Sequence, residues 1–508
     1  MAGAGTGGTR PPDRLSAAEL IDTVVDPGSW RGWDEPVADP PGIDPGYVAD
    51  LARARERTGL DEAVLTGMGR LRGRQVAVIA SEFGFLAGSI GVAAGERLVR
   101  AVERATRERL PLVAAPASGG TRLQEGTVAF LQMVKVAAAI ADHRSAGLPY
   151  LVYLRHPTTG GVLASWGSLG HVTAAEPGAL IGFLGPRVYE ALHGQPFPPE
   201  VQVAENLYAK GLVDAVVAPE EFAEVAARVL EVLCGPRELP QPAESLAGDD
   251  VEGGSVAESI RRSRRPDRPG VRALLRVAAR DVTPLSGTAA GEMDPGVLLA
   301  LARFGAAPCV LLGQDRHRQR REQPLGPAGL RAARRGVRIA SELDLPLVTV
   351  IDTAGAALSR EAEEGGLAGE IARCLVDLVT LPAPTLCLLL GEGAGGGALA
   401  FLPTDRVVAA QHAWLSPLPP EGASAVLHRT TERALEVAER QGVSVVVLWS
   451  HGIVDRIIPE FPDAADAGEA FLRRVGAVLE AELGALLRSE PSARYRERRR
   501  RYRTLGLA

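Results

Sequence analysis

Short apolar runs alternate with longer amphipathic stretches along most of the chain. Apolar runs at 110–117, 149–154 and 346–355 have the length and composition of buried strands. Apolar residues spaced three and four apart predict helices between such runs, for example over 97–109 and 128–147. The repeated order of strand and helix predicts an α/β fold rather than an all-β one.

The pattern occurs twice. The segment "LPLV" at 110–113 recurs at 345–348, and the same numbering offset links the strands and glycine turns that follow in each half. Further on, "GLVD" at 211–214 matches "GIVD" at 452–455, where the offset has grown slightly through an insertion. One fold is therefore expected in both halves, with a functional site at their junction.

The chain length and local composition predict two domains. A chain of 508 residues is too long for one ordinary core. Residues 1–14 are Gly-rich and are expected to form a disordered tail, followed by a first domain over 15–234. Residues 235–269 are rich in Pro, Gly and mixed charge, which predicts a linker before a second domain over 270–508.

Composition and charge narrow the class of protein. The chain is 46% hydrophobic but only 4% aromatic, which suits tightly packed helices on sheets. A net charge of −6 argues against a general nucleic-acid binder. The N-terminus lacks the apolar core of a signal peptide, and no apolar run approaches ~18 residues. We therefore expect a cytoplasmic protein that binds neither nucleic acid nor membrane.

The cysteines and the arginine-rich segment near the C-terminus each lead to a further prediction. The four cysteines have no metal-ligand spacing, so neither a metal site nor a disulfide is expected. Cys374 and Cys387 lie in apolar patterns typical of small core residues. The arginine-rich segment 493–506 has two interpretations: a solvated helix end, or a surface for an anionic partner such as a CoA phosphate or a carrier protein.

Four glycine-rich turns are the best candidates for chemistry, because the usual catalytic constellations are missing. They lie at 117–126, 157–165, 352–356 and 391–400, each after an apolar strand and before a helix. Such turns direct unpaired N–H groups and the positive end of a helix dipole to one point, where an oxyanion can approach closely. The alternative is that these glycines only allow helices to pack on strands; four turns in duplicated pairs favour the oxyanion site.

The motifs around these turns resemble a known family. "FGFLAGSIG", "ASGGTRLQEG" and "PTTGGVLASWGSLGHVTAAEPGALIGFLGPRV" look like the β subunit of bacterial acetyl-CoA carboxylase carboxyltransferase. "LPLVTVIDTAGA" and "LLGEGAGGGALAF" resemble its α subunit. The chain thus resembles a β–α fusion, matched over roughly residues 15–235 and 255–505. The resemblance implies two crotonase-like (ClpP/crotonase) ββα spiral domains in tandem.

The resemblance also implies a reaction: transfer of carboxylate from carboxybiotin to the α-carbon of a short acyl-CoA. Acetyl-CoA giving malonyl-CoA, as in fatty acid biosynthesis, is the first expectation and propionyl-CoA the second. The backbone oxyanion donors implied are Gly160, Gly161, Gly396 and Gly397. The pocket residues implied are Ser118, Gly119, Gly120, Arg122, Gly355 and Ala398. Arg122 either meets a CoA phosphate or the product carboxylate, or forms a salt bridge with Glu125.

Departures from the family concern partners and substrate. The four-cysteine zinc ribbon typical of the β subunit is missing, "DTPGA" reads "DTAGA" at 352–356, and "GHQKGR" reads "GQDRHR" at 313–318. The last two changes put acetyl as the substrate acyl group in doubt. Neither Lys135 nor Lys210 lies in a Met-Lys-Met biotinylation hairpin. Biotin is therefore expected on a separate biotin carboxyl carrier protein, charged by a separate biotin carboxylase, and the chain is expected to form a homodimer or a larger homo-oligomer.

Three other functions fit the same sequence less well. A biotin- or CoA-linked decarboxylase would run this chemistry backward. A non-catalytic scaffold of a carboxylase complex is disfavoured because all four glycine turns are intact. A crotonase-type hydratase would need a pair of carboxylates near the oxyanion holes; Glu392 precedes one turn, but nothing in the first half is expected to pair with it.

Overall fold

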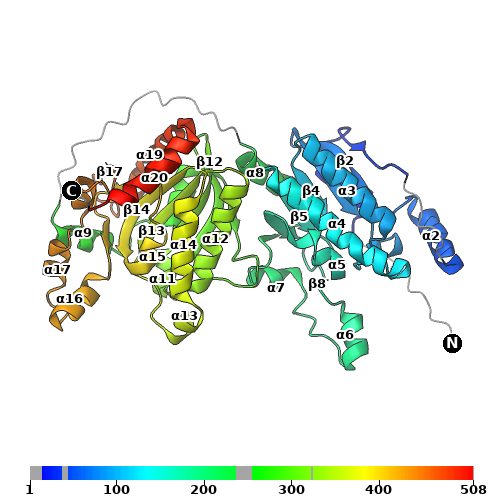
Figure 1. Ribbon diagram of the computed structural model, residues 1–508, viewed down its shortest axis with the longest axis horizontal. Helices are drawn as coiled ribbons and strands as arrows, with labels where there is room; N and C mark the ends of the chain where they lie inside the picture. The colour runs from blue at the N-terminus through cyan, green and yellow to red at the C-terminus, as the bar shows by residue number, and fades with distance from the viewer. Residues whose placement is uncertain (1–13, 37–43, 236–253, 322–323, 507–508) are drawn as a thin grey trace. The chain divides into compact units, whose positions relative to one another are not determined.

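The computed structural model describes residues 14–36, 44–235, 254–321 and 324–506, in two compact units with a boundary between residues 230 and 231. Each unit contains one large mixed sheet with helices around it (Figure 1). The two sheets are separate within the described residues. The tail predicted over 1–14 lies outside the described residues except for its last position.

The first unit contains a seven-stranded sheet in the order β1-β2-β3-β4-β5-β7-β9. Its strands are β1 (Arg31–Gly32), β2 (Val64–Leu71), β3 (Arg74–Ser81), β4 (Leu112–Ala115), β5 (Tyr150–Leu154), β7 (Val172–Ala175) and β9 (Ala215–Val216). The pairs β1–β2 and β2–β3 are antiparallel and the rest are parallel. A small parallel pair, β6 (Thr158–Thr159) and β8 (Ile181–Gly182), extends beyond the sheet.

Several helices of the first unit pack their apolar faces against this sheet. They are α1 (Ala17–Val24), α2 (Pro45–Thr58), α3 (Val92–Arg107), α4 (Gly126–Ser145), α5 (Gly160–Leu163), α6 (Pro186–His193), α7 (Ala204–Ala209) and α8 (Pro219–Leu233). On α4 the buried residues recur every three or four positions, as in Ala129, Met133, Val136 and Ile140. This spacing places them on one face of the helix, which packs into the core with the fully buried strands β4 and β5.

The second unit repeats the plan with strand order β10-β11-β12-β13-β14-β15-β17. Its strands are β10 (Ala279–Leu285), β11 (Val297–Phe304), β12 (Ala307–Gln314), β13 (Leu347–Thr353), β14 (Thr385–Ala394), β15 (Arg406–Ala410), β16 (Trp414–Ser416) and β17 (Arg456–Ile458). Its helices are α9 (Val256–Ser263), α10 (Val271–Ala278), α11 (Arg316–Arg321), α12 (Pro327–Glu342), α13 (Arg360–Glu364), α14 (Leu367–Thr380), α15 (Gly395–Leu399), α16 (Pro420–His428), α17 (Ala434–Arg440), α18 (Val445–Ser450), α19 (Gly468–Arg488) and α20 (Pro491–Thr504).

Strand register confirms the duplication. Leu112 pairs with Tyr150 in the first sheet and Leu347 pairs with Thr385 in the second, so both partners move by the offset that separates the two "LPLV" segments. The extension β6–β8 also has its counterpart, because the end of β14 pairs with β16. The repeat in the sequence therefore corresponds to two copies of one fold.

Part of the predicted linker 235–269 belongs to the second unit. Residues 236–253 lie outside the described residues, but α9 forms within the remainder. Arg268, at the end of the predicted linker, is buried and donates two hydrogen bonds, of 2.6 and 2.8 Å, to Glu460. The segment from 254 onward is therefore an integral part of the second unit.

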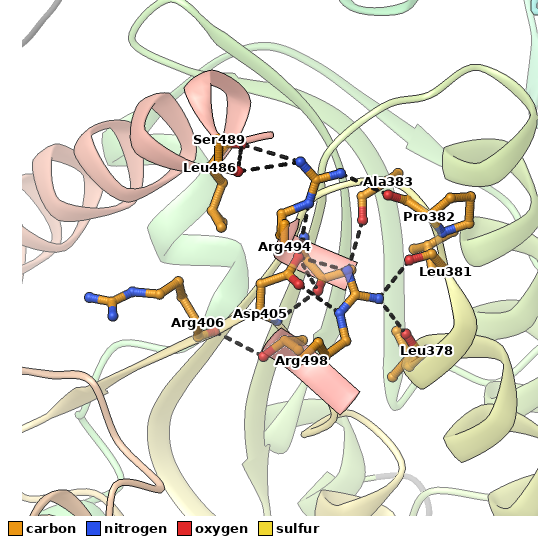
Figure 2. Close-up of polar contacts among 12 residues, drawn as sticks. Leu378, Leu381, Pro382, Ala383, Asp405, Arg406, Leu486, Ser489, Arg494 and Arg498 are labelled. Atoms are coloured by element: carbon orange, nitrogen blue, oxygen red, sulfur yellow. Dashed lines mark hydrogen bonds and ion pairs between the residues drawn. The ribbon is translucent and has the colours of Figure 1, made fainter. Parts of the chain in front are cut away.

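The arginine-rich helix α20 is solvated on only one side, because two of its arginines, Arg494 and Arg498, are buried against the second unit (Figure 2). The Arg498 guanidinium is fully buried and donates to both carboxylate oxygens of Asp405 at 2.7 Å. It also donates to the carbonyls of Leu378, Leu381 and Ala383, which close the connection between α14 and β14. Only the outer arginines, such as Arg500 with 75% of its side chain exposed, are solvated. The buried Arg498 guanidinium therefore attaches α20 to the rest of the second unit.

Three of the four cysteines, Cys309, Cys374 and Cys387, are buried, and none of the four forms a disulfide in the structure. Burial raises the pKa of the Cys374 and Cys387 thiols to about 12, so both stay protonated. None of the described helices is both long and apolar enough to cross a bilayer.

Candidate functional site

The first unit brings its two predicted glycine turns into direct backbone contact. Gly120, with φ +105°, lies after β4, and Gly160, with φ +61°, opens α5. A Cβ added to Gly120 would lie 3.2 Å from the Gly161 nitrogen and 3.3 Å from the Gly160 Cα. Both turns therefore need glycine, since the positive φ angles and the close approach each exclude most side chains.

Ser118 ties these two turns together. Its hydroxyl donates to the Gly88 carbonyl at 2.6 Å and accepts from the Gly120 N–H at 3.0 Å. Its backbone carbonyl accepts from the Thr159 N–H at 2.9 Å. The predicted pocket residue Ser118 is thus a support beneath the turns, because its side chain is buried.

The predicted donors in the first unit are not equivalent. The Gly160 N–H donates to the Phe183 carbonyl at 2.9 Å, so this group is already used within the fold. The Gly161 N–H lies in the first turn of α5, where it has no intrahelical acceptor, and α5 has no capping side chain. Gly161 is therefore the better placed of the pair to bind an oxyanion.

The second unit repeats the arrangement between the turn at 352–356 and α15. A Cβ on Gly397 would lie 3.3 Å from the Ala356 nitrogen, and one on Gly396 would lie 2.8 Å from Ile371 of α14. Gly355 has φ +130° and its N–H donates to the Thr353 hydroxyl at 3.2 Å. This last contact copies that of Gly120 with Ser118 at the equivalent place in the first unit.

Two details of this unit were not predicted. Thr353 was missed as a supporting residue, although the repeat offset from Ser118 points directly to it. The offset also equates Gly160 with Gly395, whose φ angles are +61° and +64°. The true counterpart of the first pair is therefore Gly395–Gly396, one position earlier than the predicted pair Gly396–Gly397.

The predicted site residues differ in access to solvent. Residues at least partly accessible are Gly119, Gly160, Gly161, Gly355 and Gly396. Residues buried in the chain are Ser118, Gly120, Arg122, Gly397 and Ala398. The accessible residues are the ones that a ligand could reach, and the buried residues lie beneath them in the fold.

Arg122 is used in an ion pair inside the first unit. Its guanidinium is 1% exposed and donates to Glu62 at 2.5 and 2.9 Å. The predicted partner Glu125 lies farther away, at 3.6 Å, and its other oxygen accepts from the Val92 N–H at the start of α3. Arg122 is therefore paired first with Glu62, which was not predicted, and with the predicted Glu125 at a greater distance.

The second turn lies over a cluster of buried charges. Asp352, at the end of β13, is fully buried, and this burial raises the pKa of its carboxyl group to about 6 despite Arg316 at 3.6 Å. Its Oδ1 accepts from the Glu392 N–H at 3.2 Å. The Glu392 carboxylate is itself buried and paired with Arg264 at 3.2 Å. Neither carboxylate is presented to a substrate, which argues against hydratase chemistry.

Among the described residues, no group of three or more His, Cys, Asp or Glu side chains could hold a metal ion. The candidate site of each unit therefore consists of backbone N–H groups on glycine turns, with the hydroxyl side chains of Ser118 and Thr353 beneath them. Such a site can stabilise an oxyanion.

Comparisons with known proteins agree with this chemistry. A family model described as "Carboxyl transferase domain" matches residues 9–497. The "Probable biotin-dependent acyl-coenzyme A carboxylase beta3 subunit" of Mycobacterium tuberculosis is 58% identical over 496 residues, covering 97% of this chain and 99% of that protein. The "Acetyl-coenzyme A carboxylase carboxyl transferase subunits beta/alpha" of Salinispora arenicola is 37% identical, covering 97% of this chain and 91% of that protein.

Solved structures share the fold at low sequence identity. The hexameric transcarboxylase 12S, solved with hydrolysed methylmalonyl-coenzyme A, superposes with a TM-score of 0.72 at 20% identity and covers 94% of this chain and 90% of that chain. A single-chain, multi-domain long-chain acyl-CoA carboxylase gives a TM-score of 0.70 at 21% identity and covers 90% of this chain and 46% of that chain. The prediction of two tandem crotonase-like units is confirmed.

Proposed function

The chain belongs to the carboxyl transferase family of biotin-dependent acyl-CoA carboxylases, and from this premise we propose that it carboxylates short acyl-CoA thioesters at the α-carbon. Acetyl-CoA is the first candidate and propionyl-CoA the second. The observation that carries the proposal is the contact between glycine turns in each unit, where an added Cβ would come within 3.2–3.3 Å of a backbone nitrogen.

The geometry fits a biotin-dependent transfer that needs no side-chain base. When bound, the biotin of a carrier protein supplies the carboxylate as CO2 and then, through its ureido nitrogen, the base that takes the α-proton of the thioester. The chain holds the two oxygens that gain negative charge, one at the Gly161 turn and one at the Gly396–Gly397 turn. A backbone donor of this kind is worth about 3 kcal/mol in the transition state.

The two turns have to come together for this chemistry, and we propose that a homodimer provides the contact. In this arrangement, the first unit of one chain faces the second unit of its partner. Exposed apolar residues on the equivalent helices α6 and α16 support a contact between copies, since Leu192 is 71% and Val426 73% exposed. The related transcarboxylase 12S is described as a hexamer, so larger assemblies of such dimers are compatible with the fold.

The remaining partners follow from the family. Lys135 lies within the helix α4 rather than in a hairpin, which supports biotin attachment on another chain. A biotin carboxyl carrier protein and a biotin carboxylase on other chains would supply the activated carboxylate. Without them the chain has acyl-CoA to act on but no carboxylate to transfer.

The test is direct. Purified protein is incubated with biotinylated carrier protein, biotin carboxylase, ATP, radiolabelled bicarbonate and a panel of acyl-CoAs, and acid-stable label in the acyl-CoA is measured. The expected result is label in acetyl-CoA or propionyl-CoA that depends on the biotin group. If an active carrier and carboxylase give no labelled product with any acyl-CoA, the proposed function is wrong.

A further inference from the structure

Gln314 connects the two glycine turns of the second unit through one side chain. It is the last residue of β12 and is fully buried. Its Nε2 donates to the Gly397 carbonyl at 2.7 Å, and its Oε1 accepts from the Asp352 N–H at 3.3 Å. One turn begins at Asp352 and the other contains Gly397, so the amide spans both.

In the first unit the residue at the equivalent position makes no such connection. Strand register equates Ala80 with Gly313, because Ala80 pairs with Ala115 and Gly313 pairs with Val350, the repeat counterpart of Ala115. Ser81 is therefore the counterpart of Gln314. The Ser81 hydroxyl is buried and has no hydrogen-bond partner among the described residues. The long amide at 314 is thus an addition specific to the second unit.

The second turn also has more need of a brace. Gly395, Gly396 and Gly397 follow one another, so three successive residues lack a Cβ that could pack against neighbouring elements. Glycine has the largest backbone freedom of any residue, and N–H groups aimed at an oxyanion need a geometry held within about half an ångström. A hydrogen bond to the Gly397 carbonyl limits rotation of the peptide planes at the start of α15.

We propose that Gln314 is a positioning residue of the transferase site, which aims the N–H groups of the α15 turn by holding the Gly397 carbonyl against the strand end at Asp352. The inference rests on the proposed function, because it assigns the α15 turn to the reacting site. Gln314 itself touches no reacting atom. It acts through the backbone of Gly397.

The experiment compares three full-length variants. Gln314→Met keeps the size and loses both hydrogen bonds, whereas Gln314→Glu keeps an acceptor for Asp352 and loses the donor for Gly397. Gln411→Met is the matched control. Gln411 is also a buried glutamine of the second unit, accepts from the Glu460 N–H at 2.9 Å, and lies at the end of β15 rather than at a glycine turn.

Two readouts are measured on each variant: the kinetics of transfer from malonyl-CoA or methylmalonyl-CoA to biocytin, and hydrogen–deuterium exchange of peptides covering 394–400. Both Gln314 variants are expected to lower kcat about 10- to 100-fold with little change in KM, since misplacing a transition-state donor by about 1 Å costs about 100-fold. Exchange at 394–400 is expected to rise in both, and in Gln411→Met neither readout is expected to change beyond about twofold.

Three results would overturn the proposal. One is a Gln314→Met variant with more than half the wild-type kcat. Another is unchanged exchange at 394–400, and the third is an equal loss in Gln411→Met, which would mean general destabilisation. Absence of any transfer by the wild type would contradict the proposed function alone, because the exchange experiment tests the brace without activity.

Discussion

Replacing Arg498 by methionine removes the guanidinium that docks α20 on the second unit. The side chain is fully buried, as is all but 3% of its partner Asp405, so the variant leaves a buried carboxylate without its main counter-ion (Figure 2). Removing one partner of a buried ion pair typically costs about 3–5 kcal/mol. Three carbonyls also lose their donor, but undocking of α20 lets water reach them, which keeps the total near that range.

The loss is measured by differential scanning calorimetry of the full chain. At about 2–4 °C per kcal/mol for a unit of this size, the transition of the second unit is expected to fall by about 10 °C. Arg500→Met is the matched control: 75% of the Arg500 side chain is exposed on the same helix, and its loss is expected to cost less than about 0.5 kcal/mol.

A second comparison separates the ion pair from helix propensity. The double variant Arg498→Met/Asp405→Asn no longer leaves the Asp405 carboxylate without its main counter-ion, so its loss is expected to be smaller than the sum of the two single losses. The contrary result is that Arg498→Met lowers the transition temperature no more than Arg500→Met does. In that case the Arg498–Asp405 contact contributes nothing measurable to the free energy of unfolding, and α20 behaves as the solvated helix end that its composition suggested.

Three further outcomes are expected. Gly161→Val and Gly397→Val should each abolish transfer while leaving circular dichroism unchanged, whereas Gly185→Val, at a position with open space, should retain activity; more than a tenth of wild-type turnover in either of the first two would exclude that turn as an oxyanion site. Mixing the two inactive chains should restore part of the activity, since one site of a mixed dimer receives both intact turns; inactive mixed dimers would place the site within one chain. Burial raises the pKa of Asp352 from 3.8 to about 6, so the folded state holds a proton that the unfolded state releases. As pH rises from about 4 to about 6, the wild type should lose up to about 3 kcal/mol of unfolding free energy relative to Asp352→Asn. Urea titrations that show equal losses for both proteins would contradict this.

Sequence patterns predicted the parts of the fold that repeat. The constant offset between the two halves appeared in the sequence and returned as identical strand register, because a buried strand and its glycine turn are local features with a fixed spacing. The four glycine turns were found for the same reason. Their contacts in pairs follow from parallel strands that end at the same edge of a sheet.

Ion pairs between side chains far apart in the chain could not be predicted from the sequence. The only ion-pair partner that the sequence offered for Arg122 was Glu125, three residues away, but its main partner is Glu62, sixty residues earlier. The docking of Arg498 on Asp405 spans 93 residues, and nothing in the local composition distinguishes it from the exposed Arg500. Such pairs depend on how finished elements pack, and the role of Gln314 became visible only with that packing.

The pairing of Arg498 with Asp405 also has a consequence for the order of events during synthesis. The strands around Asp405 emerge from the ribosome well before α20, so a growing chain that has already formed β14 and β15 leaves the Asp405 carboxylate open to water until α20 covers it. A chain that stops before α20 lacks both this cover and the Arg498 guanidinium. The second unit therefore gains the stability of this ion pair only when its last helix has been made.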